Sequence, residues 1–284
     1  MDIKSFHLLF FLYLFHSFLL KAQPNANKSK ISYGDNPSSG SYFQSGDAKL
    51  YYEIYGKGEP ILMLHGGVYG YIDEFELFIP KLAENYQVIC LATRGHGKSE
   101  IGHEPFTYQQ RAEDAYNLLK HLKIEKAKVL GFSDGGYSAY KLAALRPEVV
   151  ERLIVIGAGD MQMAKREQFN YSEKSLMMES AEYFKNRKKI MAEPDRWDES
   201  LKMMNDLYNN DFVSSETLSL IKTPTLIMAG DADEYSNVES IVSASSLVKD
   251  AKLSIIPGCS HVVFYCNFPA VWEAMKKFII EKGK

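Results

Sequence analysis

Cysteine is scarce in this sequence, and neither sign of charge dominates. The three cysteines, Cys90, Cys259 and Cys266, are too few for a disulfide framework and match no zinc-binding spacing. The formal net charge of -3 gives no electrostatic preference for nucleic acid or for an anionic membrane. The chain also has no internal repeat and no glycine-rich phosphate loop. We therefore expect no metal, no organic cofactor and no nucleic acid partner.

The composition is that of an ordinary folded protein. Apolar residues make up 46% of the 284 residues and charged residues 24%, which excludes disordered, collagen-like and coiled-coil classes. The length suits one large domain or two small ones with a sizeable core. Aromatic residues reach 13%, which fits an apolar pocket and a well-filled core equally well.

Residues 1–22 have the pattern of a secretory signal peptide. A short positive start precedes a nearly unbroken apolar run at 8–20, which is too short to span a bilayer core, and the small residue Ala22 follows. A buried N-terminal helix is the alternative, which we disfavour because the run is apolar on every side. The sequence therefore predicts an exported protein, periplasmic or secreted, that begins near Gln23 without a membrane anchor. Residues 23–40 are polar and are predicted to form a flexible tail.

Strand-like and helix-like patterns alternate along the rest of the chain. A hairpin is predicted at 42–55, and short apolar strands at 61–64, 87–91, 128–131, 153–156, 225–228 and 253–256. Helical spacing occurs at 75–84, 107–122, 135–145, 238–248 and 269–280. This order predicts an α/β fold with a doubly wound, mostly parallel sheet, built from residues 41–159 and 221–284.

Residues 160–220 interrupt this alternation. The segment is helical in pattern, polar and rich in methionine, and it contains no strand-like run. We expect a helical lid that lies over one edge of the sheet. Its methionines suit either an adaptable apolar pocket or simple packing against the sheet.

The segment Gly131-Phe132-Ser133-Asp134-Gly135-Gly136 lies between a predicted strand and a predicted helix. A serine on such a sharp turn projects its hydroxyl above the sheet, and the small flanking residues permit the turn. The helix that follows presents free N–H groups where negative charge would develop. Ser133 is therefore a candidate nucleophile; the alternative is a glycine-rich turn without chemistry.

A serine nucleophile needs a base and an acid that orients the base. Of the seven histidines, His261 follows the last predicted strand, at the carboxyl end where doubly wound sheets place their sites. Gly230-Asp231-Ala232-Asp233 follows the preceding strand and offers two carboxylates. His65-Gly66-Gly67 ends the strand at 61–64, and the N–H groups of Gly67 and Asp134 would form an oxyanion hole. The alternative for these glycines is an ordinary strand-ending turn.

In this order, the three segments resemble the α/β-hydrolase superfamily over residues 42–280. The resemblance implies that Ser133 is the nucleophile, His261 the base and Asp233 the acid, with Asp231 as the fallback. The segment at 131–136 further resembles that of the biphenyl-hydrolase-like branch, which includes valacyclovir hydrolase. In that branch, the aspartate after the nucleophile binds an ammonium group of the substrate. The resemblance therefore implies that Asp134 binds the ammonium group of an aminoacyl ester. The alternative is that Asp134 only complements the dipole of its helix.

The sequence thus predicts hydrolysis of a small ester, or less often an amide, through an acyl-enzyme. An aminopeptidase-like enzyme, a lactonase or a C–C bond hydrolase could use the same three residues, and a non-catalytic ligand receptor is the alternative from another class. The predicted substrate contacts are Asp134, Gly66, Tyr69, Phe132 and Phe264. Cys259 and Cys266 could pair in an oxidising compartment, although inert packing is the favoured reading of all three cysteines. The oligomeric state stays open.

Overall fold

The structure is a computed structural model that describes residues 31–162 and 168–280. The predicted signal peptide, residues 1–22, lies outside the described residues, as do residues 23–30 of the predicted flexible tail. The prediction of flexibility is wrong for the part that follows. The backbone N–H groups of Gly34 and Asn36 donate to the buried carboxylate of Glu53 at 2.7 and 2.9 Å. A buried carboxylate requires such donors, and here they fix the chain against the sheet.

Eight strands form one sheet in the order β1-β2-β4-β3-β5-β6-β7-β8. They are β1 (Gly40–Ser45), β2 (Ala48–Tyr55), β3 (Glu59–Leu64), β4 (Tyr86–Leu91), β5 (Ala127–Phe132), β6 (Val150–Ile156), β7 (Thr225–Gly230) and β8 (Ala251–Ile256). β1 and β2 form the predicted hairpin, and β2 pairs antiparallel with β4. The remaining neighbours are parallel, which confirms the predicted doubly wound, mostly parallel α/β sheet.

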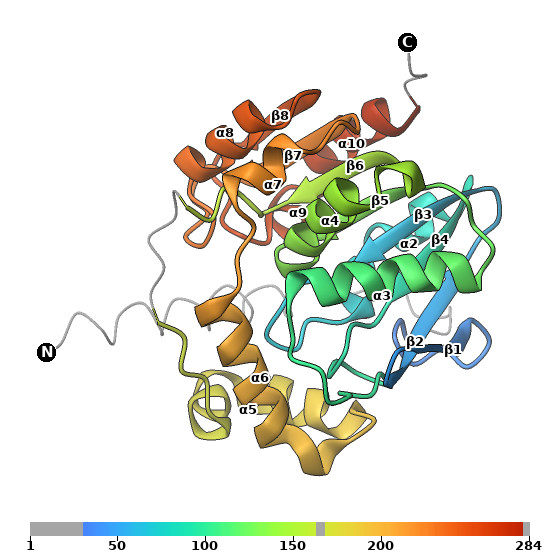
Figure 1. Ribbon diagram of the computed structural model, residues 1–284, viewed down its shortest axis with the longest axis vertical. Helices are drawn as coiled ribbons and strands as arrows, with labels where there is room; N and C mark the ends of the chain where they lie inside the picture. Colours follow the sequence, from blue (N-terminus) through green and yellow to red (C-terminus); the bar gives the residue numbers. More distant parts are fainter. Residues whose placement is uncertain (1–30, 163–167, 281–284) are drawn as a thin grey trace, which may run out of the picture.

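Helices cover both faces of the sheet and divide the interior into two apolar cores. α3 (Tyr108–His121), α4 (Asp134–Leu145) and α8 (Val238–Leu247) pack on one face, where α3 and α4 lie side by side (Figure 1). α2 (Ile79–Leu82), α9 (Val263–Cys266) and α10 (Phe268–Ile280) pack on the other. Alternation along β3 serves both: Leu62 and Leu64 enter the first core, and Ile61 and Met63 the second.

The single helix predicted at 75–84 is wrong in detail. The chain forms a 3-10 helix, η1 (Ile72–Phe75), and then the short α2. Pro80 lies in the first turn of α2, where its missing N–H is tolerated, whereas inside a longer helix it would remove a hydrogen bond. The apolar spacing survives in both pieces, because Phe75, Phe78 and Leu82 are all buried.

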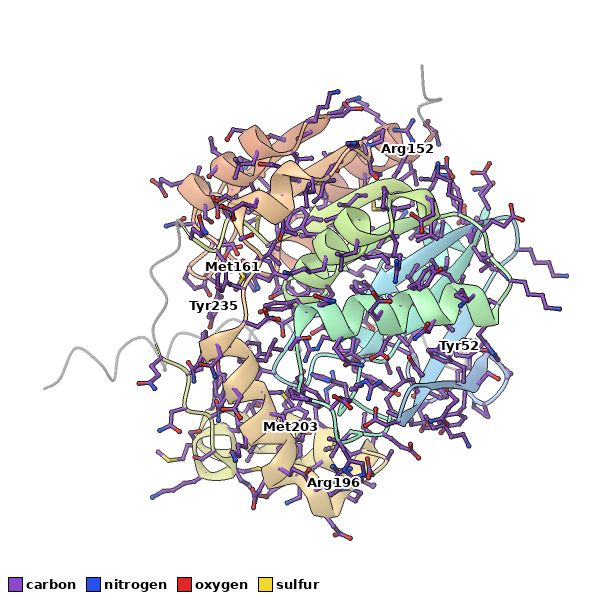
Figure 2. The ribbon with its side chains drawn as sticks, in the orientation of Figure 1. Tyr52, Arg152, Met161, Arg196, Met203 and Tyr235 are labelled. Carbon is purple, nitrogen blue, oxygen red and sulfur yellow. A yellow bond between two sulfur atoms is a disulfide. The ribbon has the colours of Figure 1, made fainter. Side chains whose placement is uncertain are left out.

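The described part of 160–220 contains helices, turns and loops and no strand. Its helices are α5 (Glu173–Ile190), η3 (Pro194–Arg196), α6 (Trp197–Asn210) and α7 (Ser215–Ser219). α5 and α6 lie beyond one end of the sheet, and Met203 marks the middle of α6 (Figures 1 and 2). α6 contributes Trp197, Met204 and Leu207 to the first core. Met204 therefore packs in the interior, whereas Met178 is 69% exposed.

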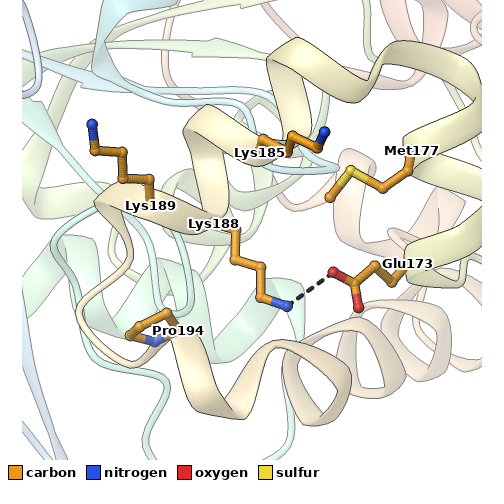
Figure 3. Close-up of a pocket in the computed structure, with 6 residues that line it drawn as sticks. All are labelled: Glu173, Met177, Lys185, Lys188, Lys189 and Pro194. Carbon is orange, nitrogen blue, oxygen red and sulfur yellow. Dashed lines mark hydrogen bonds and ion pairs between the residues drawn. The ribbon is translucent and has the colours of Figure 1, made fainter.

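A surface pocket of about 400 Å³ lies along α5 and η3 (Figure 3). Three lysines, Glu173, Met177 and Pro194 line it, and Lys188 donates to Glu173 across it at 2.9 Å. No residue predicted for the site lines this pocket.

Cys259 and Cys266 form a disulfide, and Cys90 is buried and free. The favoured reading of all three as unpaired packing residues is therefore wrong for two of them. The sulfurs meet because α9 turns the chain back within seven residues. Of the helices that the structure describes, none is both long and apolar enough to cross a membrane.

Candidate active site

Ser133 occupies the turn between β5 and α4 with a positive φ of 51° and a ψ of -118°, a combination that residues with a side chain rarely adopt. Its N–H donates to the carbonyl of Ile156 on the neighbouring strand at 2.8 Å. A Cβ on Gly135 would lie 2.0 Å from the carbonyl oxygen of Leu64, so only glycine lets α4 approach β3 this closely. The backbone of Ser133 is therefore strained, and close packing on both sides of the turn holds it in this conformation.

His261 and Asp233 meet Ser133 from two other loops. The Nε2 atom of His261 lies 2.9 Å from the Oγ of Ser133, and its Nδ1 lies 2.9 Å from the Oδ2 of Asp233. Since a carboxylate only accepts, Nδ1 carries the proton and Nε2 is left to accept from the serine hydroxyl. A continuous hydrogen-bonded chain therefore joins the hydroxyl, the imidazole and the carboxylate.

Asp233, not Asp231, is the carboxylate that contacts His261. Asp233 is 5% exposed, and its Oδ1 also accepts from the N–H groups of Tyr235 and Ser236 at 2.9 and 2.8 Å. Asp231 is exposed and accepts from the N–H of Gly258 at 2.7 Å. Burial by itself lowers the pKa of His261, but the charge and hydrogen bond of Asp233 outweigh it and raise the pKa above its ordinary 6.5.

The two N–H groups predicted as oxyanion donors belong to Gly67 and Asp134. Among the described residues, neither N–H has an acceptor. A Cβ on Gly67 would lie 2.0 Å from the Oδ2 of Asp134, which explains the glycine. Gly66 differs from its prediction: its N–H donates to Glu74 at 2.9 Å and its carbonyl lies 2.7 Å from the Nδ1 of His65. Neither polar group of its backbone is available to a substrate.

The loop that carries Gly67 is strained and is held by helices from the 160–220 segment. Val68 and Tyr69 both have positive φ, at 49° and 64°, which a β-branched residue rarely adopts. The Val68 N–H donates to the phenol oxygen of Tyr208 on α6 at 3.0 Å. The phenol of Tyr183 on α5 donates to the carbonyl of Tyr69 at 3.1 Å. These contacts fix the loop beside Ser133.

The carboxylate of Asp134 is already paired inside the protein. Its Oδ2 accepts from the Nη1 of Arg111 at 3.0 Å and from the phenol of Tyr208 at 2.7 Å. Asp134 is 6% exposed and Arg111 is 2% exposed. A charge-assisted hydrogen bond of this kind is strong in a buried site. The sequence interpretation missed Arg111, although a charge on the apolar face of the helix predicted at 107–122 was a signal that could have found it.

Of the three aromatic residues predicted to contact the substrate, Phe132 contacts the imidazole of His261, whereas Phe264 and Tyr69 do not. The ring of Phe132 lies 5.1 Å from the ring of His261, whereas Phe264 packs behind Phe132 in the core. Tyr69 is 1% exposed and stacks on Trp197 at 4.1 Å. Tyr235 was not predicted, yet its ring lies 4.9 Å from that of His261 and it is 44% exposed.

Glu74 is a further unpredicted group beside the site. Its carboxylate accepts the N–H of Gly66, and burial raises its pKa to about 7. Within the described residues, no three histidine, cysteine, aspartate or glutamate side chains are grouped so as to hold a metal ion.

Comparison with known proteins agrees with this architecture. The family described as alpha/beta hydrolase fold matches residues 59–185. A Haemophilus influenzae protein with the provisional name esterase/lipase is 28% identical over 78% of this chain and 83% of its own. The mouse (Mus musculus) serine hydrolase BPHL is 25% identical over 75% of this chain and 76% of its own. A solved meta-cleavage product hydrolase, CumD, superposes with a TM-score of 0.73 at 20% identity, covering 87% of this chain and 100% of its own.

The sheet order, the strand-to-helix turn and these similarities agree on the class of protein. The chain has the α/β-hydrolase fold, and its relatives over most of its length include proteins named as hydrolases.

Proposed function

We propose that the protein is a serine hydrolase that cleaves small carboxylic esters through an acyl-enzyme. The observation that carries the proposal is the chain of hydrogen bonds from Ser133 through His261 to Asp233. The esterase/lipase name of one relative supports the same reaction class. The 160–220 helices are proposed as a lid, because Tyr183 and Tyr208 on them contact the loop beside Ser133.

In the first half of the proposed reaction, the Oγ of Ser133 attacks the ester carbonyl while the Nε2 of His261 takes its proton. The oxyanion accepts from the N–H groups of Gly67 and Asp134. Collapse expels the alcohol, which receives the proton from His261. In the second half, His261 removes a proton from water, the hydroxide attacks the acyl carbonyl, and the proton returns to Ser133 as the acid leaves. Asp233 holds the imidazole in its Nδ1–H form throughout.

Labelling and a substrate panel test this proposal. A fluorophosphonate should modify the intact protein once, at Ser133, and His261→Ala should abolish labelling because the hydroxyl loses its base. Mass spectrometry of the labelled peptide identifies the residue. Turnover of esters, amides, lactones and C–C diketone substrates then separates the proposal from its alternatives. Labelling at another residue would refute the serine assignment, and turnover of none of the panel would favour a receptor.

Asp134→Asn tests whether Asp134 binds the ammonium group of an aminoacyl ester, as the resemblance implies. Because Arg111 already pairs with Asp134, we expect kcat/KM to fall by the same factor for p-nitrophenyl esters of alanine and of propionic acid. The variant leaves the Arg111 charge buried without a partner, so the free energy of unfolding in urea should fall by about 3 kcal/mol or more. A markedly larger loss for the alanine ester would instead support an ammonium contact with Asp134.

We also propose that the protein is exported after removal of residues 1–22. The apolar run at 8–20 supports this, as does the disulfide between Cys259 and Cys266, because disulfides persist in oxidising compartments. The periplasm and the extracellular space both satisfy this condition.

A further inference from the structure

Five buried side chains beside the oxyanion loop have polar atoms without a hydrogen-bond partner outside their own group. We call them the polar cluster: Tyr69, His96, Arg111, Trp197 and Ser200. None is more than 2% exposed. The atoms are the His96 Nε2, the Arg111 Nε and Nη2, the Trp197 Nε1, and the hydroxyls of Tyr69 and Ser200, which interact with each other. Buried polar atoms are nearly always satisfied, so a group of them calls for a partner from outside the chain.

The members of the polar cluster lie together although they come from four segments. The ring of Tyr69 stacks on Trp197 at 4.1 Å and lies 5.7 Å from the ring of His96. The Ser200 hydroxyl packs against Gly95, next to His96, because a Cβ on Gly95 would lie 2.9 Å from it. The positive charge of Arg111 reaches His96, where it adds to burial in lowering the pKa of that imidazole.

The polar cluster adjoins both proposed oxyanion donors. Tyr69 follows Gly67 by two residues in the strained loop. Arg111 uses its Nη1 for Asp134, whose N–H is the other donor, and keeps Nε and Nη2 unpaired. The polar cluster is therefore linked to both proposed oxyanion donors, through the loop at Tyr69 and through the Arg111–Asp134 hydrogen bond.

The unpartnered atoms of the polar cluster are mainly donors. Arg111 and Trp197 can only donate, and the hydroxyls of Tyr69 and Ser200 can do so. His96 is the exception. Its Nδ1 lies 2.8 Å from the carbonyl oxygen of Arg94 and so carries the proton, which leaves Nε2 as an acceptor. The complementary ligand is therefore a group with acceptor oxygens, such as a carboxylate or a carbonyl.

We propose that the polar cluster is a subsite that binds an oxygen-bearing group of the ester substrate, a carboxylate or a carbonyl. This inference rests on the proposed ester hydrolysis and gives it a substrate class. Trp197 and Ser200 belong to α6, so in this proposal α6 moves to admit the group and its return brings both side chains onto the group. Asp134 balances the charge of Arg111, which leaves both an anionic and a neutral oxygen acceptable.

Three esters of similar size test the subsite: methyl pentanoate, methyl 4-oxopentanoate and monomethyl succinate. We expect the wild type to show a higher kcat/KM for the last two, measured by acid release in a pH-stat. Trp197→Phe keeps the ring and removes the N–H, and Ser200→Ala removes the hydroxyl. Each should lower the ratio of kcat/KM for the oxygen-bearing esters to that for pentanoate by about three- to tenfold. The oxo and carboxylate esters distinguish a neutral from an anionic partner.

Stability separates a subsite from a structural role. Trp197→Phe deletes an atom that has no partner in the empty protein, so it should leave Tm unchanged or raise it. The matched control is Trp272→Phe, which replaces a partly exposed tryptophan on α10. It should leave the ratio of kcat/KM values at its wild-type value.

The proposal is overturned if both variants keep the wild-type ratio while Ser133-dependent hydrolysis of p-nitrophenyl acetate persists. It is also overturned if both variants lower Tm and reduce kcat/KM for all three esters by the same factor. Loss of contacts to internal water would have that effect. The first result leaves the proposed function intact, whereas absence of any ester hydrolysis removes both proposals.

Discussion

Ser133→Ala should lower kcat/KM for p-nitrophenyl acetate by roughly 10⁵-fold or more, because the oxyanion donors alone cannot replace a nucleophile. The fold should persist. The Ser133 side chain makes no cap hydrogen bond at the start of α4, and its backbone hydrogen bond to Ile156 does not depend on the hydroxyl. Steady-state kinetics and thermal unfolding of the same preparation measure both effects.

The matched control for this variant is Ser246→Ala, which removes a hydroxyl from an exposed serine on α8. It should hydrolyse the ester at the wild-type rate. Unchanged turnover in Ser133→Ala would show that another group attacks the carbonyl, and the hydrogen-bonded chain would then be structural only.

Asp233→Asn should lower kcat by about 10⁴-fold, because an amide no longer fixes the Nδ1–H form of His261. It should also change the pH profile. In the wild type, His261 accepts the serine proton only when it is neutral, so kcat/KM rises as the pH passes the raised pKa, above 6.5. Without the Asp233 charge, burial lowers that pKa against only the smaller effects of Glu234 and Asp134, so the acid limb of the profile should move to lower pH.

The same pair makes a pH-dependent contribution to stability. Because the pKa of His261 is higher in the folded than in the unfolded protein, the stabilisation is complete below 6.5 and is lost as the pH rises through the folded value. The difference in Tm between wild type and Asp233→Asn should therefore be largest at acid pH. Asp231→Asn is the control, since its carboxylate contacts only the Gly258 N–H among the described residues, and it should leave the acid limb in place. A shift in the control would return Asp231 to consideration.

The sequence sufficed for those features that short segments encode. Continuous apolar runs located the parallel strands, and a serine between a strand and a glycine-rich helix start located the tight turn at Ser133. His261 and Asp233 could be found because parallel strands end at one edge of the sheet, so the residues after β7 and β8 become neighbours.

The surroundings of the site could not be read in the same way, because they depend on contacts between distant segments. Tyr208 meets Val68 across 140 residues, and Tyr183 meets Tyr69 across 114. Nothing distinguishes these two among 18 tyrosines in the sequence. Asp134 has the local pattern of an ammonium-binding residue, yet its partner Arg111 comes from another helix. A local motif therefore indicated the chemistry of the carboxylate but not its occupant.

The phenols of Tyr183 and Tyr208 connect α5 and α6 to the strained loop at Val68 and Tyr69. A swing of α5 and α6 away from the sheet would break both contacts and let the backbone at Val68 relax from its unfavourable dihedral angles. The protein would then be unable to admit a bulky molecule and to cleave a bond in the same conformation. Turnover of large molecules would alternate between a receiving state and a reactive state, whereas a molecule as small as an acetate ester could bypass that cycle.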